Sequence, residues 1–292
     1  MKQGILIFLA VFFVLFANAK KVLVRTAEEA TAALKVASPG DSVVLANGLY
    51  RDVNVHFTAK GTDKMPVVFM SEMEGKVVFE GNSRLSFSGA YVVVNVFVWQ
   101  HGGGGLEKSS VIEFRTSSSN EATYSVLQNC IVNEFNNANK SIDNKWVSLF
   151  GQYNTVKNCL LKGKDNLGAT LTVWLKEGIA AHHTIAYNYF LDRPNGPDVD
   201  NGLESIRIGD SKTSLTDSYC KVAFYLFEAC VGEMEIISNK SGQNSYYGNT
   251  FYNSNGGLTL RDGNGAVCEG IFFWREQNPI LRHSGDWRKS CG

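Results

Sequence analysis

The segments Val126-Leu-Gln-Asn129-Cys-Ile131 and Thr155-Val-Lys-Asn158-Cys-Leu160 decide the fold, because they repeat one pattern 29 residues apart. The pattern is apolar-x-x-Asn-x-apolar, and it recurs with variations from residue 92 onward. Seven copies begin at Val92, Val126, Thr155, Ile185, Val222, Tyr246 and Val267. One repeat of this length cannot bury its own apolar face, so successive copies must stack as parallel strands. The pattern therefore predicts an all-β solenoid, a single-stranded parallel β-helix.

A second β-like segment lies between successive copies of the repeat. These segments cover residues 111–115, 146–150, 171–175, 205–208, 234–237 and 258–261. An antiparallel sandwich with Asn-rich turns is the alternative, but the repeat length does not suit hairpins. We therefore favour the solenoid.

Two residue types mark the bends and the core of this solenoid. Asn tolerates left-handed backbone conformations, and its amide can hydrogen-bond between neighbouring coils, which suits it to the bends. Cys130 and Cys159 occupy the same position in adjacent copies and are therefore expected to stack. A disulfide between them is geometrically possible, but we favour two free thiols in the core.

The first 19 residues have the composition of a cleavable export signal. Lys2 supplies a positive charge, residues 5–16 are almost entirely apolar, and Ala17-Asn-Ala19 is a small-x-small cleavage site. The apolar run is shorter than the roughly 20 residues of a spanning helix, so an uncleaved anchor is the less favoured alternative. We predict cleavage after Ala19, a secreted or periplasmic protein, and no membrane segment in the mature chain.

Residues 26–35 predict a short helix, with Thr26 as its N-cap and Glu29 three residues later. Pro39-Gly-Asp41 then turns the chain into a strand at residues 42–45. A helix at this place would cap the first strands of the stack, which would otherwise expose apolar core and free edges.

The charge balance narrows the choice of partner. Lys+Arg and Asp+Glu are both 28, so the formal net charge is zero. Because nucleic-acid binding usually needs a net basic surface, this balance argues against a nucleic-acid partner. An acidic polysaccharide would have to be held in a local basic cleft.

Charged side chains interrupt the β-like segments between residues 200 and 262. Glu233 and Glu235 are two residues apart, which would place both carboxylates on the same side of a strand. With the Asn201 side chain from the previous coil, they make three hard oxygen ligands, a set that suits Ca²⁺. Two solvated glutamates on a surface strand are the simpler interpretation of the same spacing.

Lys240 follows Glu235 by five residues, and Arg261 lies one coil later. A Lys can act as a base when burial or neighbouring cations lower its pKa, and an Arg can hold or protonate a leaving oxygen. The spacing fits equally well a pair that only binds an acidic polymer or forms surface ion pairs. In the pair His182-His183, His183 either lines the cleft or takes a place in a turn or in the core.

Three of these charged segments closely resemble polysaccharide lyase family 6, which contains the alginate lyases and chondroitinase B. They are Asn201-Gly-Leu-Glu-Ser-Ile-Arg-Ile-Gly209, Gly232-Glu-Met-Glu-Ile-Ile-Ser-Asn-Lys-Ser-Gly-Gln-Asn244 and Leu258-Thr-Leu-Arg261. Residues 39–52 and 170–175 are also similar to the family, and the likeness runs from about residue 22 to residue 273.

The resemblance implies a right-handed parallel β-helix and a Ca²⁺-assisted β-elimination in a uronate-containing polymer. Carried over by position, Asn201, Glu233 and Glu235 would ligate Ca²⁺. Lys240 would remove the C5 proton of the uronate, and Arg261 would protonate the departing glycosidic oxygen. Ca²⁺ on the uronate carboxylate would stabilise the developing enolate.

The same resemblance implies the acidic polysaccharide partner. The segments look closer to the alginate-cleaving members than to chondroitinase B, so alginate is the preferred polymer. Arg207 and His183 are the expected substrate contacts. A dermatan or chondroitin sulfate lyase of the same family, and a catalytically inactive β-helix that binds acidic glycans, are the alternatives.

Two features depart from the family pattern. Asp262 follows Arg261, where the family usually has His. Residues 274–292 lose the β periodicity and are rich in Arg and Trp, which a frameshift would explain, whereas the family's helix continues through several more coils. We therefore expect an incomplete lyase domain at residues 20–273, truncated at its C-terminal end, and an atypical tail at residues 274–292. Both features favour the inactive alternative.

Overall fold

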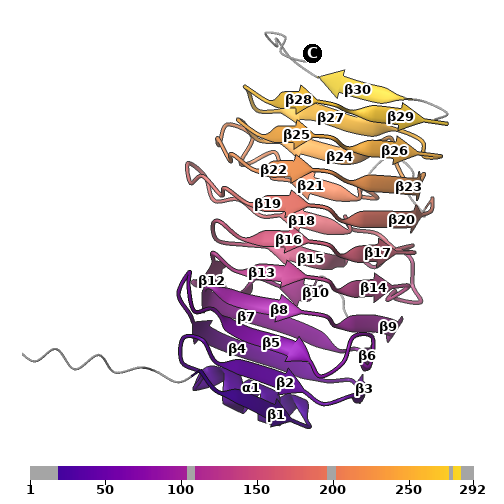
Figure 1. Cartoon of the computed structure of the whole chain (residues 1–292). Helices are drawn as coiled ribbons and strands as arrows, with labels where there is room; N and C mark the ends of the chain where they lie inside the picture. The colour runs from indigo at the N-terminus through magenta and orange to yellow at the C-terminus, as the bar shows by residue number, and fades with distance from the viewer. Residues whose placement is uncertain (1–18, 104–108, 196–201, 276–278, 284–292) are drawn as a thin grey trace, which may run out of the picture.

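The computed structural model describes residues 19–103, 109–195, 202–275 and 279–283. Over these residues the chain forms one helix and thirty strands. The strands stack in three long sheets, which the chain visits in turn as it winds along the molecule (Figure 1). This architecture is the right-handed parallel β-helix that the sequence predicted. The predicted export signal lies outside the described residues, apart from Ala19. Within the described part of the chain, no helix is both long and apolar enough to cross a membrane.

The first sheet contains the Asn-marked repeats. Its strands pair in parallel, and equivalent apolar residues of successive coils lie opposite one another, as Leu127, Val156 and Ile185 do. In spatial order the strands are β1 (Lys21–Val24), β2 (Ser42–Leu45), β5 (Val67–Ser71), β8 (Val92–Asn95), β13 (Val126–Gln128), β16 (Thr155–Lys157), β19 (Thr184–Ala186), β22 (Lys221–Ala223), β25 (Ser245–Tyr247) and β28 (Val267–Glu269).

The second sheet takes up the chain after the bend that ends most strands of the first sheet. All of its strand pairs are parallel, as in Ile131 opposite Leu160. In chain order its strands are β3 (Gly48–Arg51), β6 (Val77–Gly81), β9 (Val98–Gly102), β14 (Ile131–Asn133), β17 (Leu160–Lys162), β20 (Tyr189–Arg193), β23 (Leu226–Cys230), β26 (Thr250–Tyr252) and β29 (Phe272–Trp274).

The third sheet contains the second β-like segments, and it carries the charged residues singled out in the sequence. Its parallel strands are β4 (Asn54–Lys60), β7 (Arg84–Ala90), β10 (Ser110–Glu113), β15 (Lys145–Leu149), β18 (Leu171–Val173), β21 (Ile206–Ile208), β24 (Glu235–Lys240), β27 (Gly257–Asp262) and β30 (Ile280–His283). An antiparallel hairpin of β11 (Arg115–Ser117) and β12 (Asn120–Thr123) is added beside β7.

The Asn residues of the repeat occupy two different positions. Asn129 and Asn158 lie at the bend between the first and second sheets, where both have φ of 54°, as predicted for Asn. Asn188 and Asn249 lie one position further along the coil and are buried. The Asn188 Oδ1 accepts the backbone N–H of Cys159 in the preceding coil at 2.8 Å. Asn therefore has two structural roles. At the bend it adopts the left-handed backbone conformation, and one position later its side chain accepts a hydrogen bond from a backbone N–H of the neighbouring coil.

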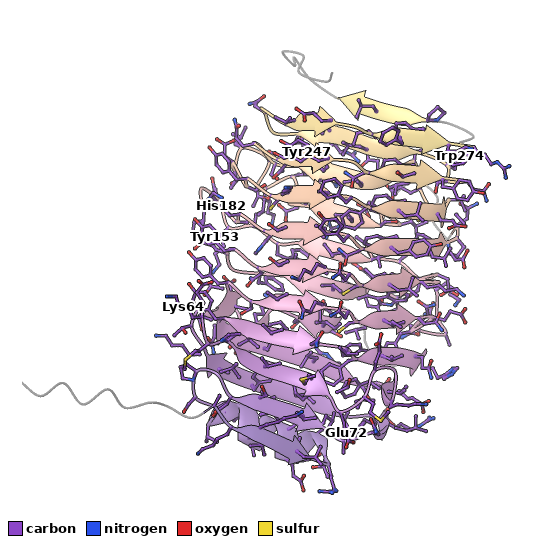
Figure 2. The ribbon with its side chains drawn as sticks, viewed as in Figure 1. Lys64, Glu72, Tyr153, His182, Tyr247 and Trp274 are labelled. Carbon is purple, nitrogen blue, oxygen red and sulfur yellow. The ribbon has the colours of Figure 1, made fainter. Side chains whose placement is uncertain are left out.

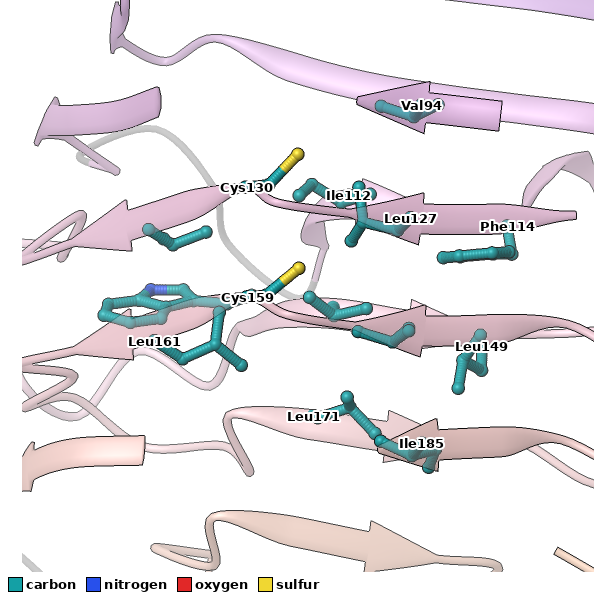
Figure 3. Packing of buried hydrophobic residues seen from close by; sticks show 14 of the residues in the cluster. Val94, Ile112, Phe114, Leu127, Cys130, Leu149, Cys159, Leu161, Leu171 and Ile185 are labelled. Atoms are coloured by element: carbon teal, nitrogen blue, oxygen red, sulfur yellow. The ribbon is translucent and has the colours of Figure 1, made fainter. Parts of the chain in front are cut away.

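The core consists of like side chains stacked from coil to coil. Cys130 and Cys159 are both buried and lie one above the other in adjacent coils (Figure 3). Both thiols are free, which confirms the preference for thiols over a disulfide. Further along the molecule, Phe190, Phe227, Phe251 and Phe273 form an aromatic column with successive ring centroids 5.2, 4.9 and 5.1 Å apart.

The N-terminal end of the stack is capped as predicted. The helix α1 (Ala27–Lys35) begins after Thr26, whose side chain accepts the backbone N–H of Glu29 at 3.1 Å. Its buried residues Ala27, Ala30 and Leu34 belong to the same apolar cluster as the first coils. The helix thereby covers apolar side chains that no further coil would bury.

The predicted boundary at residue 273 does not coincide with the end of the strands. The strand β30 lies inside the segment expected to be an atypical tail, and it pairs in parallel with β27, with Leu281 opposite Leu258. Residues 284–292 lie outside the described part of the chain.

Candidate active site

The charged residues gather on the outer face of the third sheet. Residues of this sheet alternate between the core and the opposite side, and one outward row runs through Thr172, Arg207, Ser238 and Thr259. Lys240 ends β24, and Arg261 lies at the same end of β27. The stacking of coils therefore brings together residues that are far apart in the sequence.

A register irregularity sets the position of Arg261. Between β24 and β27, Asn239 lies opposite Leu260, but Lys240 lies opposite Asp262, so Arg261 is the extra residue of a bulge. A bulge bends its strand and re-aims the inserted side chain, and such irregularities are common beside active sites. The spacing of residues in the sequence carried no signal for it.

Glu235 and Arg261 contact each other directly. The Arg261 Nη1 lies 3.1 Å from the Glu235 Oε1, and the Ser238 hydroxyl donates to the Glu235 Oε2 at 2.6 Å. The Arg261 side chain is 51% exposed and that of Glu235 is 18% exposed. The predicted acid and a predicted metal ligand are thus neighbours, with the charge of Arg261 held at the surface of the site.

Glu233 lies just before β24 rather than on it, and it is buried. Its Oε2 accepts the backbone N–H of Leu203 from the preceding coil at 2.7 Å. Burial, followed by the nearby carboxylate of Glu204, raises the pKa of Glu233 to about 7, against the lowering effect of the Leu203 N–H. The charges of Glu235 and Lys240 also act on this carboxyl, so both lie near enough to influence the charge of Glu233.

Glu204 is a site residue that the sequence reasoning missed, although it belongs to the quoted segment of residues 201–209. It is 1% exposed, and its Oε2 has no hydrogen-bond partner among the described residues. A buried carboxylate oxygen without a partner is costly unless a cation satisfies it. The signal in the sequence was its place one coil before Glu233 and Glu235.

The acidic residues fit Ca²⁺ in the chemistry of their donors. Glu204 and Glu233 present hard oxygen atoms and repel each other, which a divalent cation would relieve. Glu235 is engaged by Arg261 and Ser238, and no group of three Asp, Glu, His or Cys side chains in the described ranges is already arranged around one point. The third predicted ligand, Asn201, lies outside the described residues.

Arg193 supports the segment that enters this site. It is 3% exposed, and its guanidinium donates to the backbone oxygen of Lys164 at 2.7 Å and to that of Gly202 at 3.5 Å. The carboxylates of Glu204 and Glu233 both act on its charge. Arg193 is therefore a buried cation that ties Gly202, next to the acidic pair, to the loop of the previous coil.

The turn after Lys240 is held by a buried polar network. The Asn239 amide donates to the backbone oxygen of Asp262 at 3.0 Å. Its Oδ1 accepts from the Tyr246 hydroxyl and from the Asn244 amide, both at 2.7 Å. Because these groups are buried and mutually satisfied, the ends of β24 and β27 are rigidly placed. Lys240 is half-buried above this network.

Arg207 lies on the face predicted for substrate contact. It is opposite Ser238 in the neighbouring strand, and its guanidinium carbon is 5.3 Å from the centre of the Trp174 ring. Arg207 therefore lies one coil from Ser238, which precedes Lys240 by two residues on the same strand.

His183 does not fit the substrate contact predicted for it. The side chain is fully buried, and its Nδ1 accepts the backbone N–H of Asn154 at 3.1 Å. Burial is the main cause that lowers the pKa of His183 to about 3. Its neighbour His182 is stacked between Tyr153 and Tyr219 in a column on the edge of the molecule (Figure 2). His183 thus takes the place in the core that was the alternative to the cleft.

The three-sheet coil and the cluster of acids, Lys and Arg on one face define a class, the β-helical polysaccharide lyases. The chain matches the family model described as chondroitinase B over residues 24–281. It belongs to that family, polysaccharide lyase family 6.

Three solved structures illustrate the likeness. The PL6 family alginate lyase AlyGC is 38% identical, with a TM-score of 0.81, over 87% of this chain and 35% of that one. The PL6 lyase Pedsa3628 from Pseudopedobacter saltans is 32% identical, with a TM-score of 0.79, over 87% of this chain and 58% of that one. A mannuronic acid specific family 6 lyase from human gut microbiota is 31% identical, with a TM-score of 0.81, over 88% and 59%. The chain thus spans less than two thirds of the length of these relatives. No curated protein matches it significantly.

Proposed function

We propose that the protein is a lyase for a uronate-containing polysaccharide, with alginate as the preferred substrate. The observation that carries this proposal is the convergence of Lys240, Arg261 and an acidic group on one face of the third sheet. The alginate lyases among its relatives support the choice of polymer.

Lys240 and Arg261 have the chemistry that β-elimination requires. Lys240 takes the proton from C5 of the uronate, and the electrons of that C–H bond form the C4=C5 double bond. The C4–O bond breaks, and Arg261 donates a proton to the departing oxygen, so that no water is consumed. Glu235 holds the Arg261 guanidinium at 3.1 Å beforehand, which limits the directions in which it can donate.

Glu204, Glu233 and Glu235, with Asn201, are the residues that would hold Ca²⁺. When bound, the ion neutralises the uronate carboxylate and so makes the C5 proton more acidic. Arg207 and Arg261 supply positive charge to the same face, on which an acidic polymer can be oriented.

One assay tests the proposal. The full chain is incubated with alginate or dermatan sulfate, with Ca²⁺ or with a chelator, and the unsaturated product is followed by its ultraviolet absorbance. We expect product from alginate, and Lys240→Ala should lower the rate by about 10²–10⁴-fold because it removes the base. Lys162→Ala is the matched control, because Lys162 is also half-buried at a strand end but on the second sheet.

The outcomes separate the candidate functions. Product from dermatan sulfate alone would favour the second substrate, to which the name of the matching family model points. Binding of either polymer without any product would identify an inactive glycan-binding β-helix and would reject the lyase.

We also propose export of the protein with cleavage after Ala19. The support is the sequence of residues 1–19 and the substrate class, because large acidic polysaccharides lie outside the cell membrane. N-terminal sequencing of the protein recovered from a bacterial periplasm or medium tests it. A recovered chain that retains residues 1–19 would reject the cleavage site.

A further inference from the structure

A hollow of about 360 Å³ opens on the third-sheet face, at the same strand ends as Lys240. One wall is the hairpin β11–β12, which contributes Arg115 and Glu121. The other wall comes from the residues that follow β15 and β18, including Phe150, Trp174 and Lys176. The volume lies within the usual range for small-molecule and sugar sites.

The hollow is in line with Lys240 along the molecule. Phe150, Trp174 and Lys240 each follow a core-facing residue of the same row, so the three occupy one outer column, at the ends of β15, β18 and β24. With strands about 4.8 Å apart, Trp174 is two coils (about 10 Å) and Phe150 three coils (about 14 Å) from the level of Lys240. A polymer that lies along the column therefore reaches the hollow within a few sugar units.

The coil between Trp174 and Lys240 adds no side chain to this column. Its residue in the column is Gly209, which has φ of 76° and no side chain. A Cβ there would come within 3.0 Å of the Lys240 backbone oxygen and 3.1 Å of the Leu175 side chain. The backbone of Lys240 and the side chains of Leu175 and Thr213 therefore close around Gly209, and no side chain of the column itself stands between the hollow and Lys240.

The walls combine an aromatic surface with positive charge. The rings of Phe150 and Trp174 are parallel within 5°, with centroids 5.9 Å apart, and the Arg115 guanidinium carbon lies 3.6 Å from the Phe150 centroid. Phe150 is 7% exposed and supports the other two side chains, so the Trp174 ring is the aromatic surface for the C–H face of a pyranose, and the Arg115 guanidinium suits its carboxylate. Trp174 is half-buried, and Arg115 keeps 32% of its side chain exposed.

The charge of the hollow favours an anion. Its charged lining residues are two cations, Arg115 and Lys176, and one carboxylate, Glu121, which leaves a formal excess of one positive charge. Lys176 pairs with Glu121 at 2.7 Å. The nearest carboxylate oxygen to Arg115 belongs to Glu113, at 3.9 Å, and Glu113 is shared with Arg84 at 3.7 Å. Arg115 is thus the cation least neutralised by its surroundings.

We propose that this hollow is a distal binding site for non-reacting uronate units of the same polymer chain whose bond is cut at Lys240. The inference rests on the proposed lyase function and adds a preference for long chains. Binding energy at this distance acts mainly on KM, because the contact is the same before and during the reaction.

The test compares Arg115→Met with Arg51→Met. The Met side chain keeps the apolar contact with Phe150 and removes the charge. Arg51 is the matched control, because it is also paired with one glutamate, at 2.7 Å, but lies on the second sheet. In Arg115→Met we expect KM for an alginate hexasaccharide to rise about tenfold, because one charged contact is lost. We expect kcat to stay within about twofold of the parent value. KM for a trisaccharide, and both constants in Arg51→Met, stay unchanged.

Calorimetric binding in a Lys240→Ala background keeps the test independent of turnover. There, Arg115→Met should weaken the hexasaccharide about tenfold and leave the trisaccharide unchanged. If the parent chain is active but the Arg115 and Arg51 variants behave alike with both lengths, the distal site is rejected and the lyase stands. If no uronate polymer is cut but hexasaccharide binding depends on Arg115, the lyase is rejected and the site stands.

Discussion

At the scale of single residues, buried side chains complete the backbone hydrogen bonds between coils. The Ser125 N–H donates to the Asn154 Oδ1 at 2.9 Å, and the Asn154 N–H donates to the His183 Nδ1 at 3.1 Å. His183 is therefore one rung of an internal ladder. Its Nδ1 must stay unprotonated to accept, and burial lowers its pKa from 6.5 to about 3.

Because of this lowered pKa, the stability of the folded protein depends on pH in the acid range. Between about pH 6.5 and pH 3 the unfolded chain binds a proton at His183 that the folded chain does not, so stability falls as the pH falls through this window. His183→Asn keeps an acceptor at the rung, as Asn154 does, and removes the titration. We expect parent and variant to unfold at similar urea concentrations near neutral pH or above, and the parent to lose more stability in acid.

His183→Ala separates the hydrogen bond from the titration. It leaves the buried Asn154 N–H without an acceptor, which should cost about 1–3 kcal/mol even at neutral pH. Parallel stability curves for parent and His183→Asn across the acid range would show that His183 is not the titrating group.

The residues of the site were partly predictable for a physical reason. Lys240, Arg261 and Glu233 converge because the coil repeat superposes residues of successive coils, and the repeat is visible in the sequence. The contact between Arg261 and Glu235 was not predictable, because it depends on a bulge and on side-chain rotamers. His183 was named as a substrate contact, with a core or turn position as the alternative, because the pair His182-His183 carries no sign of which way either side chain points.

At the scale of elements, the end of β27 is fitted closely against the end of β24. Two residues after the bulge at Arg261 comes Gly263, which has φ of 86°. A Cβ at this position would lie 2.1 Å from the backbone carbon of Ser241. Gly263 therefore allows both the left-handed turn and the close approach of two backbones that hold Arg261 beside Lys240.

Gly263→Ala should damage both the fold and the site. The left-handed conformation alone costs roughly 1–2 kcal/mol for Ala, and the backbone clash adds about 1–3 kcal/mol. Gly178→Ala is the control, because Gly178 also has a positive φ, 70°, but a Cβ there would meet no other atom within 4 Å. Urea unfolding should show a clearly larger loss for Gly263→Ala. Equal losses in the two variants would mean that the backbone at Gly263 can move aside.

The strands of the first and third sheets between residues 92 and 269 were largely predictable, but the hairpin β11–β12 was not. The segments at residues 146–150 and 258–261 lie within one or two residues of β15 and β27, because the first is a short, mostly apolar run and the second alternates apolar and polar residues. The segment at residues 111–115 divides into β10 and the start of the hairpin β11–β12. That hairpin is mostly polar, so no hydrophobic period marked it, yet it builds one wall of the distal hollow.

At the scale of the whole molecule, each coil contacts mainly the coil before it and the coil after it (Figure 1). In such a stack, stability is approximately a sum of the stabilities of single coils and of the interfaces between neighbours. Parts far apart along the molecule are then coupled only through the coils between them. The candidate site depends most on β21, β24 and β27, which lie in the half of the stack away from α1.

Phe227→Ala tests this one-dimensional behaviour. Phe227 is fully buried in the aromatic column, and truncating a buried Phe costs about 3–5 kcal/mol. We expect hydrogen exchange to lose protection in β20, β23 and β26 and in the neighbouring third-sheet strands, while β2 and β5 keep theirs. Phe57→Ala is the matched control at the other end, because Phe57 is also buried and stacks on Phe87 at 6.0 Å. It should loosen the coils near α1 and spare β24 and β27. If either variant instead loses protection evenly from β2 to β27, the solenoid unfolds as a single cooperative unit, and changes made far from Lys240 would reach the site through global stability.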